Sequence, residues 1–185
     1  MNVFLAGASG VVGLPLTRLL VARGHRVFGM TRTPGCAPML WSTGAVPVVV
    51  NAFDAPAVER ALLAIRPDAV IHQLTDLPYA LEPSQMAAAV VRNARVRNVG
   101  TANLVAASLL AGTKHLIAQS IGWAYRPEDG PWDEDCPLDL GATGSRAITV
   151  GGVVALEESV LRTPGLDGCA LRHGELYGPG TGTSD

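Results

Sequence analysis

Three glycines follow the first apolar run of the chain at a spacing of three residues: Gly7, Gly10 and Gly13, in the stretch AGASGVVG. Glycine permits tight turns and lets the backbone approach a ligand closely. A helix that begins directly after such a turn offers unpaired N–H groups and the positive end of its dipole, and both favour phosphate groups. The spacing therefore predicts a phosphate-binding loop that works through its backbone.

The segments on either side of the glycines support this interpretation. The preceding NVFLA (2–6) predicts a short buried strand, and Val12, Leu16 and Leu19 share one face of a helix that starts near Val11. A glycine turn between a strand and a helix is the context of a dinucleotide-binding loop, in which N–H groups contact the pyrophosphate. We expect contacts to the cofactor from Gly7, Ser9, Gly10, Val11, Val12 and Gly13.

The rest of the chain alternates between strand and helix patterns, which is typical of a parallel sheet covered on both faces. The predicted fold is α/β: a Rossmann-type, doubly wound parallel sheet of six strands in the order 3-2-1-4-5-6, with the cofactor across the switch point. The chain of 185 residues fits one dinucleotide-binding domain, 1–185. The predicted strands cover 2–6, 25–31, 45–50, 68–74, 114–120 and 168–174, and the predicted later helices 57–66, 83–111 and 151–162.

Composition and charge argue against several other classes. The net charge of −2 offers no electrostatic basis for binding nucleic acid, and the basic run RNARVRN (92–98) lies inside a helical pattern. No apolar run is long enough for a membrane span, and no signal peptide is visible. The three cysteines are scattered without metal-ligand spacing, so we expect reduced thiols, no metal site and a cytoplasmic protein.

The G-x-x-G-x-x-G spacing resembles the short-chain dehydrogenase/reductase superfamily, in its extended branch of NAD(P)-dependent epimerases and dehydratases. Four further stretches are similar to motifs of that family: NAFD (51–54), VIHQLT (70–75), NVGTANLVAA (98–107) and LRHGELYGPG (171–180). The resemblance implies that Asp54 meets the adenine and that Leu74 also contacts the cofactor. It also implies a homodimer that forms through the long helices over 83–111 and 146–163.

The residues after the second predicted strand bear on the choice of dinucleotide. A site that prefers NAD usually has Asp or Glu there to bind the ribose 2′-hydroxyl, and none occurs between His25 and Leu40. Arg32 stands there instead, between Thr31 and Thr33, and a guanidinium with hydroxyl neighbours suits a 2′-phosphate. The sequence thus predicts a preference for NADP(H), with NAD(H) possible; the alternative is a surface arginine without a ligand.

The catalytic half of the resemblance is incomplete. The family pattern Y-x-x-x-K-x-x-x-E falls on TVGGVVALE (149–157), where Glu157 matches but Thr149 replaces the Tyr and Val153 the Lys. That Tyr is the acid/base, and the Lys lowers its pKa because a phenol of pKa ≈ 10 is a poor base near neutral pH. The family's Ser or Thr position holds Ile121, one residue after Ser120. The candidate catalytic residues are therefore Ser120 and Tyr125.

Other polar residues have weaker claims to a role. Tyr177, His173 and Glu175 lie at or just after the end of the last predicted strand, at the edge of the sheet where ligands bind in α/β folds. His72 is expected to be a packed core histidine. The acidic cluster 133–135 is expected to be a solvated loop, and Arg97 stands where the family helix has Asn.

The chain stops soon after the sixth predicted strand, so the substrate lobe of the family is expected to be absent or truncated; a naturally short protein and a fragment both remain open. Two functions compete. One is an NADP(H)-binding, epimerase/dehydratase-like oxidoreductase for a small carbonyl or alcohol or a sugar nucleotide. The other is a non-catalytic NAD(P)-binding sensor or partner subunit. A fold retained without a ligand is a third interpretation.

Overall fold

The computed structural model describes residues 1–78, 81–178 and 181, and its centre is one parallel sheet. The six strands are β1 (Asn2–Ala6), β2 (Arg26–Thr31), β3 (Val46–Val49), β4 (Ala69–His72), β5 (His115–Ile121) and β6 (Asp167–His173). They lie in the order β3-β2-β1-β4-β5-β6, and every strand pair is parallel. The predicted α/β doubly wound sheet and its strand order are confirmed.

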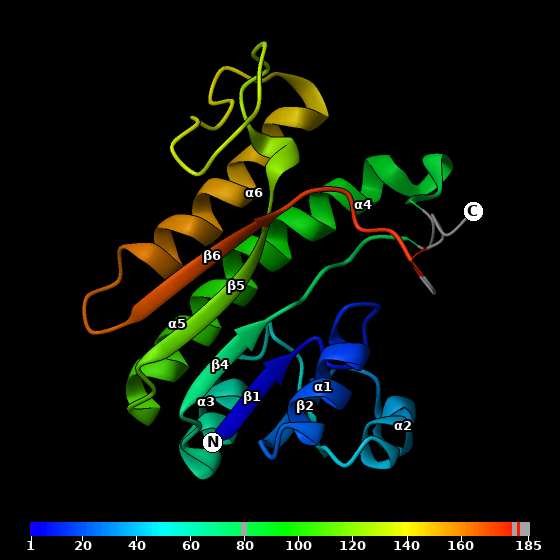
Figure 1. Cartoon of the computed structure of the whole chain (residues 1–185), viewed down its shortest axis with the longest axis vertical. Helices are drawn as coiled ribbons and strands as arrows, with labels where there is room; N and C mark the ends of the chain where they lie inside the picture. Colours follow the sequence, from blue (N-terminus) through cyan, green and yellow to red (C-terminus); the bar gives the residue numbers. More distant parts are fainter. Residues whose placement is uncertain (79–80, 179–180, 182–185) are drawn as a thin grey trace.

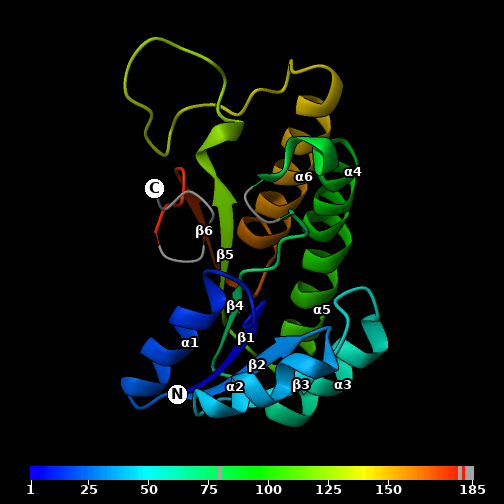
Figure 2. The same cartoon turned by 90° about the vertical axis from the view of Figure 1, so that its right-hand side faces the viewer.

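Helices cover both faces of this sheet (Figure 2). One face carries α1 (Gly13–Ala22) and α2 (Ala37–Ser42). The other carries α3 (Ala55–Ile65), α4 (Pro83–Arg95), α5 (Thr101–Ala111) and α6 (Gly144–Leu161). Between α4 and α5 lies a π-helical turn, η3 (Val96–Gly100), and short 3₁₀ turns occur at η1 (Pro34–Cys36) and η4 (Gly122–Ala124).

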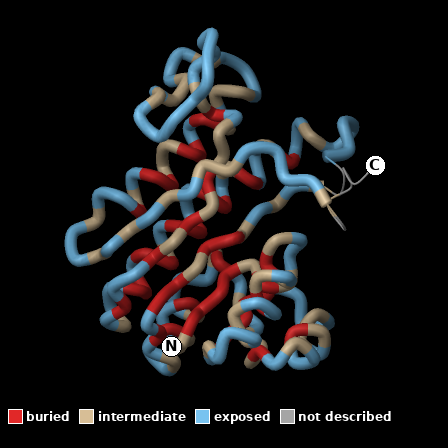
Figure 3. The backbone as a smooth tube through the Cα atoms, viewed as in Figure 1, coloured by how far each residue is buried: buried red, intermediate tan, exposed pale blue. Residues whose placement is uncertain are grey.

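Two apolar cores form because successive strand residues point to opposite faces of the sheet. Phe4 belongs to the core beneath α3, α5 and α6, together with Leu62, Leu104 and Leu156. Its neighbour Leu5 belongs to a smaller core beneath α1 and α2. Figure 3 shows buried residues concentrated in β1, β4 and the adjoining helices, whereas β6 alternates between exposed and half-buried residues.

Four local features differ from the sequence prediction. Helix α1 starts at Gly13 and not near Val11, and α6 starts at Gly144, earlier than the pattern indicated. Helix α2 was not predicted, because it is only six residues long and contains Pro38. The predicted helix 83–111 is interrupted by the π-helical turn η3.

A long loop, 125–143, lies beyond the carboxyl end of β5 and joins η4 to α6 (Figure 1). This loop is tied to itself by an antiparallel bridge between Tyr125 and Leu138. No helix among the described residues is long and apolar enough to cross a membrane.

Candidate functional site

The glycine loop brings the ends of β1, β4 and α1 into close contact. Gly7 has φ +86°, and a Cβ there would lie 2.7 Å from the carbonyl oxygen of Gln73. A Cβ on Gly13 would lie only 2.0 Å from the carbonyl oxygen of Gly7. Both positions therefore require glycine, the first for its backbone angle and the second so that α1 can pack directly on the end of β1.

This packing leaves donors open at the start of α1. Val12 precedes the helix without a side-chain cap, and the first helical bond of the loop runs from the Leu14 N–H to the Gly10 carbonyl, 2.9 Å. Within the described residues, the N–H groups of Val11, Val12 and Gly13 have no backbone acceptor. Three adjacent free N–H groups at a helix N-terminus fit a pyrophosphate.

Gln73 adds a second unsatisfied group beside this loop. Its N–H donates to the Ala6 carbonyl, 2.8 Å, so its backbone continues the sheet next to Gly7. Its side-chain Oε1 is enclosed and has no hydrogen-bond partner within the described part of the chain. A buried acceptor left without a donor costs free energy. A donor from a molecule held by the glycine loop, such as a ribose hydroxyl, would satisfy it.

At the end of β2, Arg32 is already paired. Its Nη1 lies 3.1 Å from a carboxylate oxygen of Asp76, whose other oxygen lies 3.5 Å from Nε of Arg92. One carboxylate thus serves two guanidinium groups, and the Arg32 side chain is 58% exposed. The hydroxyls of Ser9 and Thr31 lie 3.1 Å apart, joining the glycine loop to this strand end.

Two further predicted cofactor residues line the same edge of the sheet. Asp54 is exposed and caps α3, with Oδ1 accepting from the Ala57 N–H at 3.0 Å. Leu74 packs against the larger core, and its N–H donates to Nδ1 of His72 at 3.1 Å. Their predicted contacts to the cofactor remain predictions, since the structure gives their positions alone.

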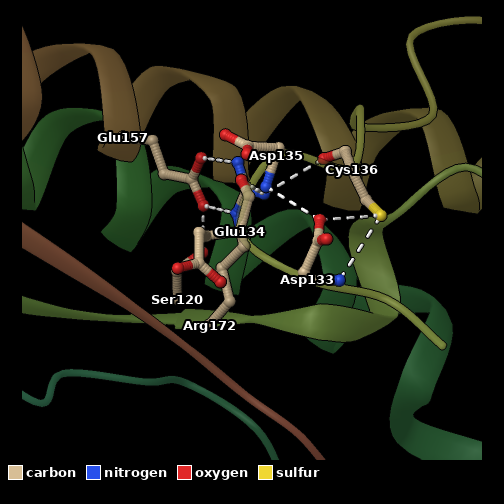
Figure 4. Close-up of polar contacts among 7 residues, drawn as sticks. All are labelled: Ser120, Asp133, Glu134, Asp135, Cys136, Glu157 and Arg172. Atoms are coloured by element: carbon tan, nitrogen blue, oxygen red, sulfur yellow. Dashed lines mark hydrogen bonds and ion pairs between the residues drawn. The ribbon is translucent and has the colours of Figure 1, made fainter.

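The candidate catalytic Ser120 takes part in a buried network (Figure 4). Its hydroxyl donates to Oε1 of Glu157 at 2.6 Å. Arg172 binds the same carboxylate with two nitrogens, at 3.0 and 2.8 Å. These hydrogen bonds and the nearby negative charge raise the pKa of Arg172 above its usual range. Another nitrogen of Arg172 donates to the carbonyls of Glu134 and Cys136, each at 3.2 Å, and so fastens the acidic loop over the network.

The three positions of the family's proton relay are not assembled here. Val153 is fully buried and packs with Ala124 and Val150 in a third apolar cluster, which Ile121 also borders. The hydroxyl of Thr149 donates to the carbonyl of Ser145 one turn earlier in the same helix, 3.3 Å. These positions supply neither a phenol nor a lysine, so an acid/base for a carbonyl would have to come from elsewhere.

The ring of the other candidate, Tyr125, packs between two side chains. Its ring lies beneath the Arg172 guanidinium, 4.9 Å from the ring centroid, and stacks on Trp132 with centroids 6.4 Å apart. Tyr177 is 84% exposed, His173 is half-buried and Glu175 is exposed. Part of the motif LRHGELYGPG, at 179–180, lies outside the described residues.

His72 is the packed core histidine that the sequence predicted, and Arg97 is buried beside it. His72 is enclosed, with Nε2 2.9 Å from the Thr101 hydroxyl; burial, together with the nearby charge of Arg97, lowers its pKa to about 4. Arg97 itself is 3% exposed, and burial lowers its pKa to about 10. No group of three or more His, Cys, Asp or Glu side chains within the described ranges is arranged to hold a metal ion.

The sequence model of the NAD(P)H-binding family matches residues 7–183. A 3-diazoavenalumate denitrifying reductase of a Streptomyces species is 44% identical over 184 residues, which cover 98% of this chain and 58% of that protein. An uncharacterized Mycobacterium tuberculosis protein is 31% identical over 139 residues, 75% of this chain and 14% of its own. The chain therefore spans well under two thirds of the length of these curated relatives.

Solved structures share the fold at lower identity. The UDP-glucose 4-epimerase of Thermotoga maritima, crystallised with UDP-glucose, superposes with a TM-score of 0.75 at 21% identity, covering 96% of this chain and 55% of that one. The Bordetella bronchiseptica enzyme WbmH in complex with NAD⁺ also gives 0.75, at 23% identity, covering 97% of this chain and 57% of that one. At these identities the likeness shows the fold alone.

Proposed function

Because the chain belongs to the NAD(P)H-binding family, we propose that it is a reductase that uses NADP(H) in preference to NAD(H) to reduce a small molecule. The observation that carries the proposal is the glycine loop. Gly13 lies against Gly7 with no room for a side chain, and the N–H groups at the start of α1 remain open. Such a loop is suited to binding a pyrophosphate, whereas a simple turn between a strand and a helix needs neither this close packing nor the open N–H groups.

Residues at the ends of three strands would contact different parts of the cofactor. Gly7, Ser9 and Gly10 to Gly13 would hold the pyrophosphate, and Gln73 would accept from a ribose hydroxyl with its unpaired Oε1. Asp54 and Leu74 would line the adenine side. When bound in its reduced form, the nicotinamide supplies a hydride.

The preference for NADP(H) rests on Arg32. The segment from His25 to Leu40, which includes β2 and the residues after it, supplies no Asp or Glu to accept from a 2′-hydroxyl, and Arg32 is largely exposed beside Thr31 and Thr33. Its partner Asp76 is shared with Arg92, so this cluster of two guanidinium groups and one carboxylate has a surplus positive charge. A 2′-phosphate would supply the missing negative charge.

Titration with NADPH and with NADH, followed by nucleotide fluorescence, tests this assignment. We expect Arg32→Ala to weaken NADPH binding about tenfold, the loss of a charge-assisted contact, and to change NADH binding less than about twofold. Asp76→Asn releases Arg32 from an exposed ion pair of about 0–1 kcal/mol, so NADPH should bind up to about fivefold more tightly. Equal affinity of both nucleotides for wild-type protein, unchanged by Arg32→Ala, would refute the preference.

The missing proton relay bears on the substrate. Reduction of a carbonyl needs a proton as well as a hydride, and a positioned side chain usually supplies it. An organic diazonium group needs none: its carbon takes the hydride as dinitrogen leaves, R–N₂⁺ + H⁻ → R–H + N₂. The Streptomyces relative is named as a denitrifying reductase of a diazo compound. We therefore rank a diazonium compound above a carbonyl, an alcohol or a sugar nucleotide as the substrate.

Steady-state oxidation of NADPH distinguishes these substrates. An aryl diazonium salt should accelerate the loss of NADPH absorbance with release of one N₂ for each NADPH, while aldehydes, ketones and sugar nucleotides leave the rate at background. The rate without protein must be subtracted, because diazonium salts react slowly with nucleophiles in water. Turnover of a carbonyl without turnover of the diazonium salt would overturn the ranking.

A non-catalytic nucleotide sensor is the second candidate, and the packing of Val153 favours it. The lysine position of the family is closed by an apolar cluster, and the Thr149 hydroxyl is bonded within its own helix. Micromolar NADPH binding with no oxidation of NADPH by any substrate of the panel would select the sensor.

A further inference from the structure

Arg97 is a buried cation without an ion-pair partner among the described residues. It lies in the π-helical turn η3 between α4 and α5 and is 3% exposed. Its guanidinium forms no hydrogen bond or ion pair with any residue that the structure describes. Gln73 Oε1 is the one fully enclosed side-chain polar atom without a partner in the same residues, so the nitrogens of Arg97 keep a small exposed area. A π-helical turn inside a helix frequently marks a functional position.

The neighbours of Arg97 place it beneath the carboxyl ends of β4 and β5. His72 ends β4 and bonds to Thr101, one turn after Arg97 in the helix, and the charge of Arg97 opposes protonation of that imidazole. On the other side, Glu157 attracts the guanidinium from α6. Ligands of doubly wound folds bind outside the carboxyl ends of the strands, at the switch point, which here lies between β1 and β4 and so borders the end of β4.

The acid that could neutralise Arg97 is already occupied. Both carboxylate oxygens of Glu157 bind Arg172, and one of them also accepts from Ser120. His72 is neutral near pH 7, because its pKa is about 4. Two guanidinium groups and one carboxylate therefore leave this part of the interior with a net charge of +1. A buried unpaired charge is costly, and proteins normally compensate it.

We propose that Arg97 binds a carboxylate of the substrate that enters the crevice beside the cofactor. The planar guanidinium matches a carboxylate with two parallel hydrogen bonds, and the single bound charge balances the cluster. This proposal rests on the proposed function, since it assigns the substrate class of the reductase: small organic acids.

Binding of benzoate, measured by calorimetry with NADPH present, tests the assignment. Wild-type protein should bind benzoate, and Arg97→Asn should weaken it at least about tenfold, because a charge-assisted bidentate contact is lost. Asn is the residue of the resembling family at this position, so the variant is suited to fold. Arg97→Lys keeps the positive charge but loses the pair of parallel hydrogen-bond donors, so it should bind benzoate with intermediate affinity. The neutral analogue benzamide should bind neither wild type nor variant.

Three controls keep the result specific. Arg60→Asn, at an exposed arginine of α3, should bind benzoate like wild type. Arg97→Asn should bind NADPH within about twofold of wild type, since the glycine loop is untouched. Equal benzoate binding by wild type and Arg97→Asn, or binding of inorganic phosphate but not of benzoate, overturns the proposal. If wild type fails to bind NADPH, the proposed function fails, and the same benzoate titration without nucleotide still decides the role of Arg97.

Discussion

At the scale of single residues, two ionisable side chains, His72 and Arg97, lie close together in the interior beneath β4, and the charge of Arg97 disfavours a charge on His72. His72 must be neutral, because burial and the charge of Arg97 both disfavour the imidazolium. Its hydrogen bonds fit one tautomer: Nδ1 accepts from the Leu74 N–H, so Nε2 carries the proton and donates to Thr101. The neutral ring therefore fixes the chain direction where β4 leaves the sheet and the cofactor edge begins.

This arrangement predicts a pH dependence of stability. The unfolded chain protonates His72 near pH 6.5, whereas the folded protein does so near pH 4. Between these values the unfolded state binds more protons, so the free energy of unfolding falls as the pH drops from 6.5 to 4, by about 3 kcal/mol in total. Urea unfolding at several pH values should show a steeper fall for wild type than for His72→Gln.

A second variant separates titration from the loss of a hydrogen bond. Thr101→Val removes the partner of Nε2 and should lower stability at every pH, yet it should keep the wild-type slope because burial is the main cause of the lowered pKa. Parallel curves for wild type and His72→Gln would show that His72 titrates normally in the folded protein.

The sequence identified candidate functional residues but not the residues to which they bond. The sequence marked Arg32, Ser120 and Arg97 as departures or candidates, because their positions follow strand ends or family motifs. It could not reveal that Arg32 pairs with Asp76, 44 residues away, or that Ser120 bonds to Glu157, 37 residues away. Such pairs depend on how crossover segments return to the sheet, and local pattern does not encode that.

At the scale of elements, the contact between α1 and β1 determines whether the loop can hold a phosphate. The helix approaches so closely that a Cβ on Gly13 would lie 2.0 Å from the carbonyl oxygen of Gly7. Any side chain must therefore displace the first turn of α1, together with the open N–H groups of Val11 and Val12. Strand packing and ligand binding depend on the same backbone position.

Gly13→Ala should consequently lose affinity for NADPH by at least about tenfold, and its stability should fall by about 1–3 kcal/mol through overpacking. Nucleotide fluorescence and urea unfolding measure the two effects. Gly35→Ala is the matched control, because a Cβ there meets nothing within 4 Å, and it should behave like wild type. Wild-type affinity in Gly13→Ala would mean that this contact does not position the loop.

Long elements were predictable and short irregular ones were not. The central strands are largely apolar runs, and the sequence pattern found all six strands within a few residues. Helix α2 has six residues with Pro38 inside, too few for a periodic signal. The turn η3 was hidden because a π-helical turn adds one residue without altering composition, although it changes which face Arg97 presents.

At the scale of the whole molecule, α4 and α6 form a two-helix outer surface that no described element covers. The helices approach closely where a Cβ on Gly152 would lie 3.0 Å from Cα of Ala94. Outward from this contact, Val91 is 55% exposed and Ile148 is 41% exposed. A groove of about 380 Å³ between the helices is lined by Val91, Ala94, Arg95, Asn98, Val99, Ile148, Gly151 and Gly152.

We propose that a second copy of the chain packs on this surface about a two-fold axis, as the resemblance to extended reductases implies. Helices of 13 and 18 residues offer roughly 20 and 27 Å of length, the scale of an interface burying about 800 Å² per partner. In such an isologous contact each apolar residue occurs once on each side of the two-fold axis, so one substitution changes the interface at two places.

Ile148→Glu should therefore shift the mass in sedimentation from dimer to monomer while NADPH binding is unchanged. Leu110→Glu, at an equally apolar and 60% exposed position on α5 away from the groove, should stay dimeric. A monomeric wild type at tens of micromolar would exclude this dimer.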